Sequence, residues 1–134
     1  MNVRPPQLVV PEGPWGTVEF AIRTSGKMPA QKFLRDLGDD AARAMALFRE
    51  MVEYGRVLNS VRFSQEAGKI YAFKHRLAKK NRQVRWPCFQ IGNRWLLTHG
   101  FFKPGAQRGR GKWPREELQR ALQIKREHLE LESP

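Results

Sequence analysis

Hydrophobic and polar residues alternate near the start of the chain. Val18, Phe20 and Ile22 are separated by polar side chains, and a period of two is typical of a strand with one buried face. Turn-forming residues follow from Gly26, where the alternation stops. The pattern therefore predicts a strand that begins near residue 17 and ends before this glycine.

Apolar residues then recur at helical spacing. Pro29 suits the first turn of a helix, and Gly38 is expected to end it. Asp39 or Asp40 is expected to cap a second helix that ends at Gly55. The short connection predicts that the two helices form an antiparallel hairpin. The apolar stripe of the second helix consists of Ala41, Ala44, Met45, Phe48 and Val52.

After the second helix the period returns to two. The strand candidates 69–75, 82–91 and 94–102 predict a three-stranded antiparallel meander. Pro87 has no amide donor, which predicts a bulge or an unpaired edge in the second of these strands. Pro114 opens a final helix. Its inward positions are predicted to be Leu118, Ala121, Leu122 and Leu129.

This order of elements predicts an α+β fold: an N-terminal strand and helix hairpin, the meander, and a C-terminal helix. Residues 1–14 contain four prolines and are expected to form an irregular arm, and residues 15–134 a single domain. Cys88 is the only cysteine, which favours a reducing, cytoplasmic compartment. The chain has no apolar run suited to a secretory leader or a membrane helix, so no membrane partner is expected.

Basic charge is concentrated in one internal block. Residues 67–115 carry 13 Lys and Arg and no carboxylate, whereas residues 1–66 carry 9 basic and 8 acidic groups and residues 116–134 carry 3 and 5. The block thus contributes +13 to a net charge of +12, and the two flanks contribute +1 and −2. Because the block also holds the strand candidates, the charge is expected on a folded face. Such a face indicates a polyanionic partner.

Several kinds of site are missing from this block. It has no pair of carboxylates for a two-metal nuclease site, no Cys/His spacing for zinc and no phosphate-binding Gly-Lys-Ser/Thr loop. No metal or other cofactor is therefore predicted. The candidate functional side chains are cations interleaved with aromatic residues. The cationic candidates are Lys74, His75, Arg76, Arg82, Arg85, His99, Lys103, Arg108, Arg110 and Lys112, and the aromatic ones are Tyr71, Trp86 and Trp113.

Strand alternation predicts that one sheet face gathers Lys74 and Arg85, with His99 and Lys103 at the end of the next strand. Such a cluster could bind the phosphates of an extended RNA, with aromatic residues stacking on the bases. It could also cleave RNA without a metal. Attack of a 2′-hydroxyl on the adjacent phosphorus needs a base, cations for the phosphoryl oxygens and an acid for the leaving 5′-oxygen.

These patterns do not determine which side chains act as the base and the acid. A histidine titrates near neutral pH, and a lysine packed among cations has a lowered pKa, so either can serve. His99 and His75 are each compatible with proton transfer or with a structural role. His128 lies near the end of the last helix and is interpreted as a helix-terminal cation.

Three segments carry a recognisable pattern: Arg82-Gln-Val-Arg85, then Ile91-Gly-Asn-Arg-Trp-Leu-Leu-Thr-His-Gly-Phe-Phe-Lys103, then Lys112-Trp-Pro-Arg-Glu-Glu-Leu. They resemble the phage-derived HigB-like branch of the RelE/ParE toxin superfamily. That branch reads R-x-x-R-V-x-Y, a short turn, a strand ending H-G-F-x-K-K, then K-T-P and a helix with an acidic start. The resemblance spans roughly residues 17–130. Pro104 stands where the pattern has its second lysine.

The resemblance implies a RelE-like fold and a toxin of a type II toxin–antitoxin pair. Most characterised members of the RelE and HigB kind cut mRNA in the ribosomal A site without a metal. The expected partners are therefore mRNA, the ribosome and a helix-turn-helix-type antitoxin protein. Two alternatives stay open: a non-catalytic basic phage protein that binds RNA or the ribosome, and a ParE-like gyrase inhibitor.

Matching by position implies a division of roles among the cations. The resemblance assigns catalysis to Lys74, Arg85, His99 and Lys103. The RNA-binding residues are expected to be His75, Arg76, Arg82, Arg108, Arg110 and Lys112. The patterns predict neither the oligomeric state nor the identity of the general base.

Overall fold

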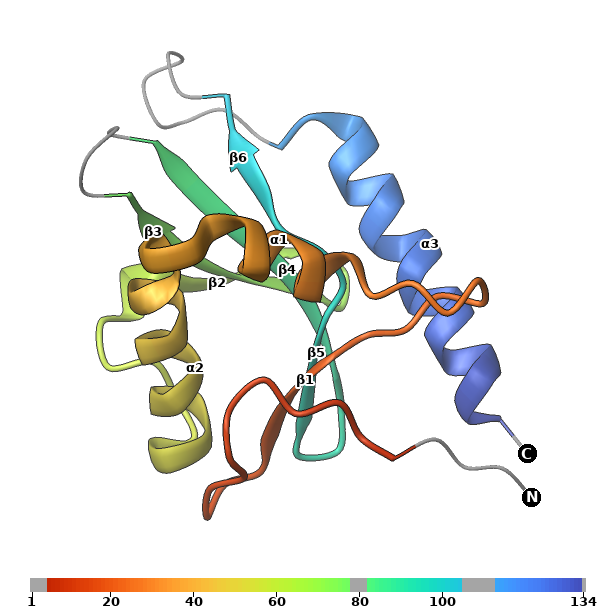
Figure 1. Ribbon diagram of the computed structural model, residues 1–134, viewed down its shortest axis with the longest axis horizontal. Coiled ribbons are helices and arrows are strands. Elements are labelled where there is room, and N and C mark those ends of the chain that lie inside the picture. The colour runs from red at the N-terminus through yellow and green to blue at the C-terminus, as the bar shows by residue number, and fades with distance from the viewer. Residues whose placement is uncertain (1–4, 78–81, 105–112, 134) are drawn as a thin grey trace.

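The computed structural model describes residues 5–77, 82–104 and 113–133. Within these ranges a six-stranded mixed sheet is flanked by α-helices on both faces (Figure 1), which confirms the α+β class. The elements in chain order are β1 (Thr17–Phe20), α1 (Pro29–Leu37), η1 (Gly38–Ala41), α2 (Ala42–Tyr54), η2 (Ser60–Arg62), β2 (Phe63–Ala67), β3 (Ile70–Arg76), β4 (Gln83–Ile91), β5 (Arg94–Leu97), β6 (Phe101–Lys103) and α3 (Arg115–Glu132).

The sheet has the strand order β1-β5-β4-β3-β2, and β6 pairs with β4 beyond the end of β5. β1 and β5 are parallel, and all the other pairs are antiparallel. The consecutive pairs β3–β4 and β4–β5 confirm the predicted meander. β2 is a further strand that the pattern did not predict. Its sequence is largely polar because it lies at an edge, so no apolar alternation marks it.

Pro87 explains why the predicted strand 94–102 is divided into two. The β4–β5 ladder ends at Cys88 and the β4–β6 ladder begins at Arg85, so the break lies opposite the proline. The proline cannot donate, but its carbonyl accepts both the backbone N–H and the hydroxyl of Thr98, at 2.9 and 3.2 Å. A side chain at Gly100 would collide with the ring of Phe33 on α1, so this break needs a glycine.

The two N-terminal helices meet at a corner and do not form the predicted antiparallel hairpin. In Figure 1 α1 runs across the view and α2 runs down it. The turn η1 leads directly from one helix into the other, and each helix packs on the sheet separately. Gly38 and Gly55 end the helices as predicted, with φ of 56° and 76°. Neither Asp39 nor Asp40 caps α2, because both lie within η1, and no side-chain cap bond forms.

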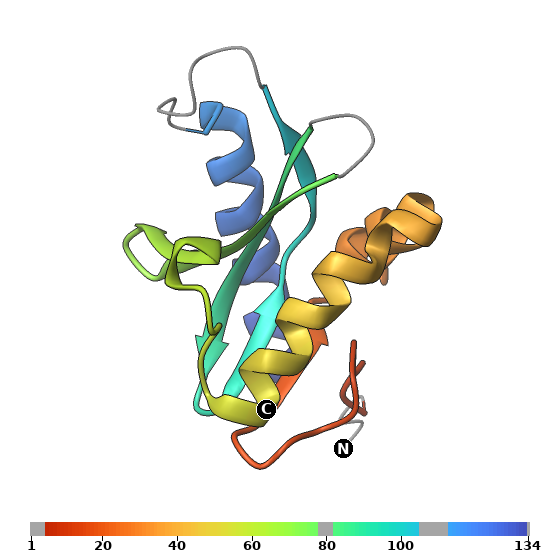
Figure 2. The ribbon, with the colours of Figure 1, turned by 90° about the vertical axis from the view of Figure 1, so that its left-hand side faces the viewer.

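Two hydrophobic cores lie on the two sides of the sheet (Figure 2). The larger one is covered by α1 and α2, where Phe48 meets Phe73 and Trp86 edge to face with ring centroids 5.0 and 5.4 Å apart. Cys88 is fully buried in this core. The smaller core lies under α3. Its buried members are Ala21, Ile70, Phe89, Leu96, Ala121 and Ile124.

The inward face of α3 differs from the predicted one. Ala121 is buried as expected, but Leu122 and Leu129 are 43% and 39% exposed. Ile124 and His128 are buried instead, so the stripe lies along a neighbouring line of the helix. The imidazole of His128 is packed inward near the end of the helix, with Nε2 2.6 Å from Glu132 Oε2. Its Nδ1 accepts the backbone N–H of Ile22 at 2.9 Å, which ties the end of α3 to the segment after β1.

The N-terminal arm has no helix or extended strand in its described part, but it follows the outer edge of β1. The N–H of Val9 donates to the Val18 carbonyl, and the N–H of Phe20 donates to the Gln7 carbonyl, both at 2.8 Å. Val10, which belongs to the arm, is buried in the larger core at 2% exposure. Residues 7–10 thus cover one edge of the sheet. No helix in the described part of the chain is long and apolar enough to cross a membrane.

Candidate nucleic-acid interface

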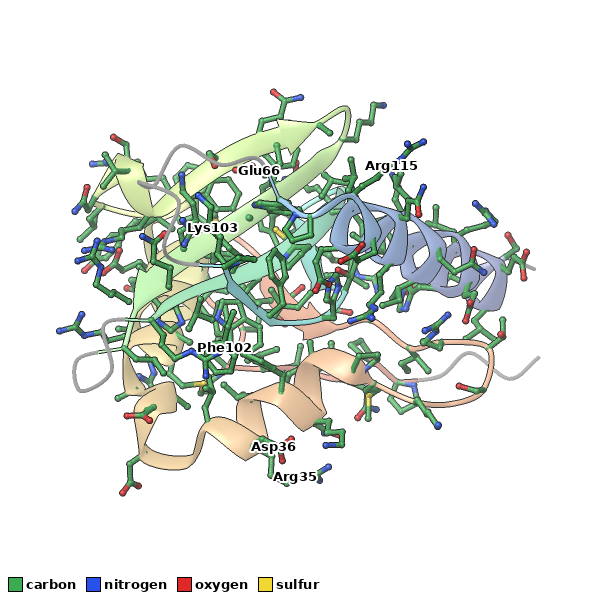
Figure 3. All side chains as sticks on the ribbon, turned by 90° about the horizontal axis from the view of Figure 1, so that it is seen from above. Arg35, Asp36, Glu66, Phe102, Lys103 and Arg115 are labelled. Carbon is green, nitrogen blue, oxygen red and sulfur yellow. The ribbon has the colours of Figure 1, made fainter. Side chains whose placement is uncertain are left out.

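A row of cations lies on the sheet face that α3 leaves open. Lys74 on β3 is directly opposite Arg85 on β4, and Arg76 is opposite Gln83, which is in turn opposite Lys103 on β6. Cross-strand partners project to the same face, so one surface gathers these side chains. Figure 3 shows Lys103 and Phe102 on opposite sides of β6, as alternation requires. This confirms the predicted juxtaposition of Lys74, Arg85 and Lys103.

Arg62 extends this row, and its place was not predicted. It ends η2 immediately before β2, and it lowers the pKa of both Lys74 and Arg85 through charge repulsion. We define the cationic face as Arg62, Lys74, Arg76, Arg85 and Lys103. Recognising β2 as a strand next to β3 would have placed Arg62 here.

Three cations of this face, Lys74, Arg85 and Lys103, have lowered pKa values. Burial is the main cause for Lys74, followed by the repulsion of Arg85 and Arg62. The pKa of Lys103 is lowered by burial and then by Arg85 and Lys74. The Glu66 carboxylate raises the pKa of both lysines, and it offsets these effects only in part. A site with this concentration of positive charge favours the binding of an anion.

The guanidinium of Arg85 is held in place at the centre of this face. Its Nη1 donates to the Val84 carbonyl at 3.1 Å, and its Nη2 donates to Gln83 Oε1 at 2.7 Å. Both contacts come from its own strand and leave the group half-buried. An anchored guanidinium loses little side-chain entropy when it binds a phosphate, which is how a site becomes preorganised.

His99 lies apart from the cationic face. It is 2% exposed, and its ring nitrogens contact Thr98 Oγ1 at 3.0 Å and Glu117 Oε1 at 3.1 Å. Burial, followed by the repulsion of Arg120 and Arg23, lowers its pKa to about 3. The imidazole is therefore neutral near pH 7 and joins the break after β5 to the first turns of α3.

His75 points to the other face of the sheet. It is 3% exposed, and its Nε2 accepts the indole N–H of Trp86 at 2.9 Å. Burial is the main reason that its pKa falls to about 4. Its Nδ1 has no hydrogen-bond partner among the described residues, and an unsatisfied buried donor costs about 1–3 kcal/mol.

The remaining predicted RNA-binding residues are distributed differently. Arg82 lies on the α1 side of β4, with its guanidinium carbon 3.6 Å from the centroid of the Phe102 ring. Arg76 belongs to the cationic face and is exposed. Three further residues lie outside the described part of the chain: Arg108, Arg110 and Lys112.

Positive charge near the end of α3 is neutralised. Arg94 on β5 binds Glu19 with Nε and Nη2 at 2.9 Å each, and binds Glu132 with Nη1 and Nη2 at 2.8 and 2.6 Å. Arg23 pairs with Glu127 at 2.8 Å. The cationic face lies at the opposite end of the sheet from these ion pairs.

In the described part of the chain, no group of three or more His, Cys, Asp or Glu side chains is placed so that it could hold a metal ion. A scan against models of protein families and a search of curated proteins both return no match.

Proposed function

We propose that the cationic face binds the phosphate backbone of single-stranded RNA, and that the protein is a toxin that cleaves ribosome-bound mRNA without a metal. The observation that carries this proposal is the row of Lys74, Arg85 and Lys103. Two lysines of lowered pKa flank an anchored guanidinium. The resemblance to the RelE/ParE superfamily supports the same function and implies an antitoxin as partner.

The proposed reaction needs three roles, and the cationic face offers a side chain for each. Lys74 in its neutral form takes the proton of the 2′-hydroxyl, whose oxygen attacks the adjacent phosphorus. Arg85 neutralises the charge that builds up on the phosphoryl oxygens. Lys103 in its charged form donates a proton to the 5′-oxygen as the P–O5′ bond breaks. The products are a 2′,3′-cyclic phosphate end and a 5′-hydroxyl end.

His99 has a positioning role in this proposal. Its contacts with Thr98 and Glu117 hold the break between β5 and β6 against α3. The direction of β6, and with it the place of Lys103, depends on this contact. Replacing His99 should therefore lower the melting temperature and the activity together, whereas a proton-transfer residue would lower activity alone.

One observation favours a second candidate, a non-catalytic protein that binds RNA or the ribosome. Both histidines expected near the site are buried, and both are neutral at pH 7. Within the described residues the cationic face therefore has no histidine to act as acid or base. Binding needs only the cations, so it would survive the loss of catalysis. The gyrase-inhibitor alternative stays a prediction that no feature of the cationic face favours.

The test is inducible expression in bacterial cells with mapping of mRNA 5′ ends. We expect growth arrest that a co-expressed antitoxin relieves, and new 5′ ends within translated message. Lys74→Ala and Arg85→Ala should each lower cleavage by about two to three orders of magnitude. Arg49→Ala is the matched control, because Arg49 is exposed on α2 and is not part of the cationic face.

Three outcomes separate the candidates. Normal growth with verified high levels of folded protein would overturn the toxin proposal. Unchanged cleavage in both Lys74→Ala and Arg85→Ala would show that the cationic face is not the active site. Co-sedimentation with ribosomes without new 5′ ends would replace the nuclease by the binding protein.

A further inference from the structure

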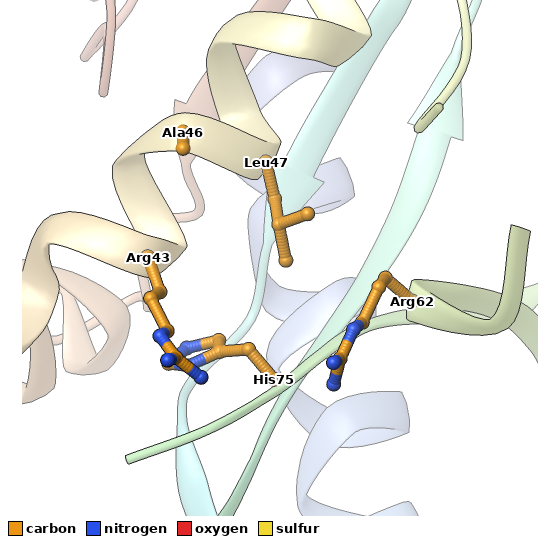
Figure 4. A pocket seen from close by; sticks show the side chains of 5 residues that line it. All are labelled: Arg43, Ala46, Leu47, Arg62 and His75. Carbon is orange, nitrogen blue, oxygen red and sulfur yellow. The ribbon is translucent and has the colours of Figure 1, made fainter. Parts of the chain in front are cut away.

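A pocket lies between α2 and β3, on the side of the sheet that α2 covers, and Arg62 at the edge of the cationic face also lines it. It is open, has a volume of about 330 Å³ and is lined by Arg43, Ala46, Leu47, Arg62 and His75 (Figure 4). Figure 4 shows His75 between the arginine of α2 and the arginine that precedes β2. None of the described residues that line this pocket, which we call the His75 pocket, is acidic.

The tautomer of His75 follows from its contact with Trp86. An indole nitrogen can only donate, so Nε2 of His75 must accept, and the neutral ring carries its proton on Nδ1. That N–H has no acceptor in the described part of the chain. The Arg76 backbone acts on the imidazole and raises its pKa, but it makes no hydrogen bond of normal geometry to Nδ1; its carbonyl accepts Arg43 Nη1 at 3.2 Å. His75 therefore lines the pocket with a ring whose buried Nδ1–H has no partner of normal hydrogen-bond geometry among the described residues.

The side chains around His75 select an anionic ligand. Among the described residues, the charged side chains with the largest effect on its pKa are guanidinium groups, from Arg43, Arg62 and Arg85. Two of these arginines line the pocket with this N–H of His75, so the site offers donors and positive charge without a matching acceptor. Leu47 adds an apolar wall. A phosphate group, with its several acceptor oxygens, matches this set of donors.

Arg62 connects the pocket with the cationic face. It lines the pocket beside His75, and its charge also lowers the pKa of Lys74 and Arg85 on the other face. We propose that the His75 pocket binds a backbone phosphate of the RNA strand where that strand leaves the cationic face around Arg62. The proposal rests on the proposed RNA-binding function and adds a second phosphate subsite to it.

The pocket can be tested alone with inorganic phosphate as the probe. The chain has 3 histidines, so their ring resonances can be assigned by NMR in protein labelled with ¹⁵N. We expect a saturable shift of the His75 ring and none for His99 or His128, whose ring nitrogens all contact protein groups. Arg43→Gln should weaken this binding about tenfold, whereas Arg49→Gln on the same helix should not.

The role in RNA binding is tested with two lengths of single-stranded RNA, roughly four and roughly eight nucleotides. A short strand can occupy the cationic face alone, whereas the longer one can reach the pocket. We expect Arg43→Gln to weaken binding of the longer strand about tenfold and to leave the shorter one unchanged. Lys74→Ala should weaken both, and Arg49→Gln neither.

The results distinguish failure of this proposal from failure of the proposed function. If the longer RNA binds Arg43→Gln and the unaltered protein equally, the second subsite is refuted while the cationic face stands. If phosphate shifts all three histidines alike, binding in the pocket is non-specific and the subsite is also refuted. If neither RNA binds but phosphate still moves His75 alone, the RNA-binding function fails and so does the RNA subsite, leaving only an anion site.

Discussion

The salt dependence of RNA binding gives a direct count of the cations that contact the strand. The cationic face contributes Arg62, Lys74, Arg76, Arg85 and Lys103, and the His75 pocket adds Arg43. Each phosphate contact on a single strand releases counterions and contributes about 0.7 to the slope of log K against log salt, so these six cations predict a slope of about −4. Raising the salt from about 50 to about 200 mM should thus lower the affinity about 250-fold.

The assay is fluorescence anisotropy with a labelled single-stranded RNA of about eight nucleotides. Removal of one contacting cation should reduce the slope by about 0.7, to about −3.5, and lower the affinity at every salt concentration. Arg43→Gln and Lys74→Ala should both do this. Arg49→Gln removes the same charge from the same helix as Arg43→Gln but should leave the slope unchanged, which separates direct contact from a general effect of net charge.

A slope flatter than about −2 would refute the reasoning, because fewer than three phosphates would then be neutralised. Equal slopes for Lys74→Ala and the unaltered protein would remove Lys74 from the interface. The segments 78–81 and 105–112 lie outside the described residues and contain further Lys and Arg. Any further phosphate contact from these segments would make the slope of log K against log salt steeper than about −4.

Two predictions concern stability. Arg94→Ala leaves Glu19, which is 2% exposed, without its cationic partner and with the Thr17 hydroxyl still donating to it at 2.6 Å. The change should lower the free energy of unfolding by about 3 kcal/mol in urea denaturation; a loss below about 1 kcal/mol would show that the carboxylate is solvated. The pKa values of His75 and His99 are about 4 and about 3 in the folded protein, against an ordinary value of 6.5. As the pH drops from 6.5 toward these values, the unfolded chain therefore binds more protons than the folded protein. Stability should therefore fall as the pH drops below about 6.5, by up to about 1.4 kcal/mol per pH unit for each histidine, and a flat profile between pH 6.5 and 4.5 would contradict the burial of both rings.

Local patterns predicted the parts of the site that depend on strand alternation alone. Lys74 and Arg85 could be placed on one face because each belongs to a strand whose period is clear in the sequence. Pro87 also marked the break in the pairing, since the loss of its amide donor is a local property. The pattern did not reveal that the following strand divides there, because that depends on the bond from Thr98 to the proline carbonyl.

Other parts of the site depend on contacts between segments that are distant in the chain. The burial of His99 follows from the way α3 folds back and places Glu117 beside it, and spacing alone leaves such a histidine undecided. Arg62 could not be placed because the polar sequence of β2 hides the strand that carries it to β3. The His75 pocket likewise requires the corner between α1 and α2, which sets the position of Arg43.

The position of Cys88 makes the chain suited to kinetic measurements of its own opening. The thiol is the only one in the sequence, it is fully buried under α1 and α2, and burial raises its pKa well above the ordinary value. A thiol-specific reagent can therefore react only after the core has opened. When reclosing is slower than the reaction, the labelling rate equals the opening rate of the sheet, without any engineered reporter. The same measurement with RNA present would show whether a ligand on the outer face of the sheet slows the separation of its inner face from the helices.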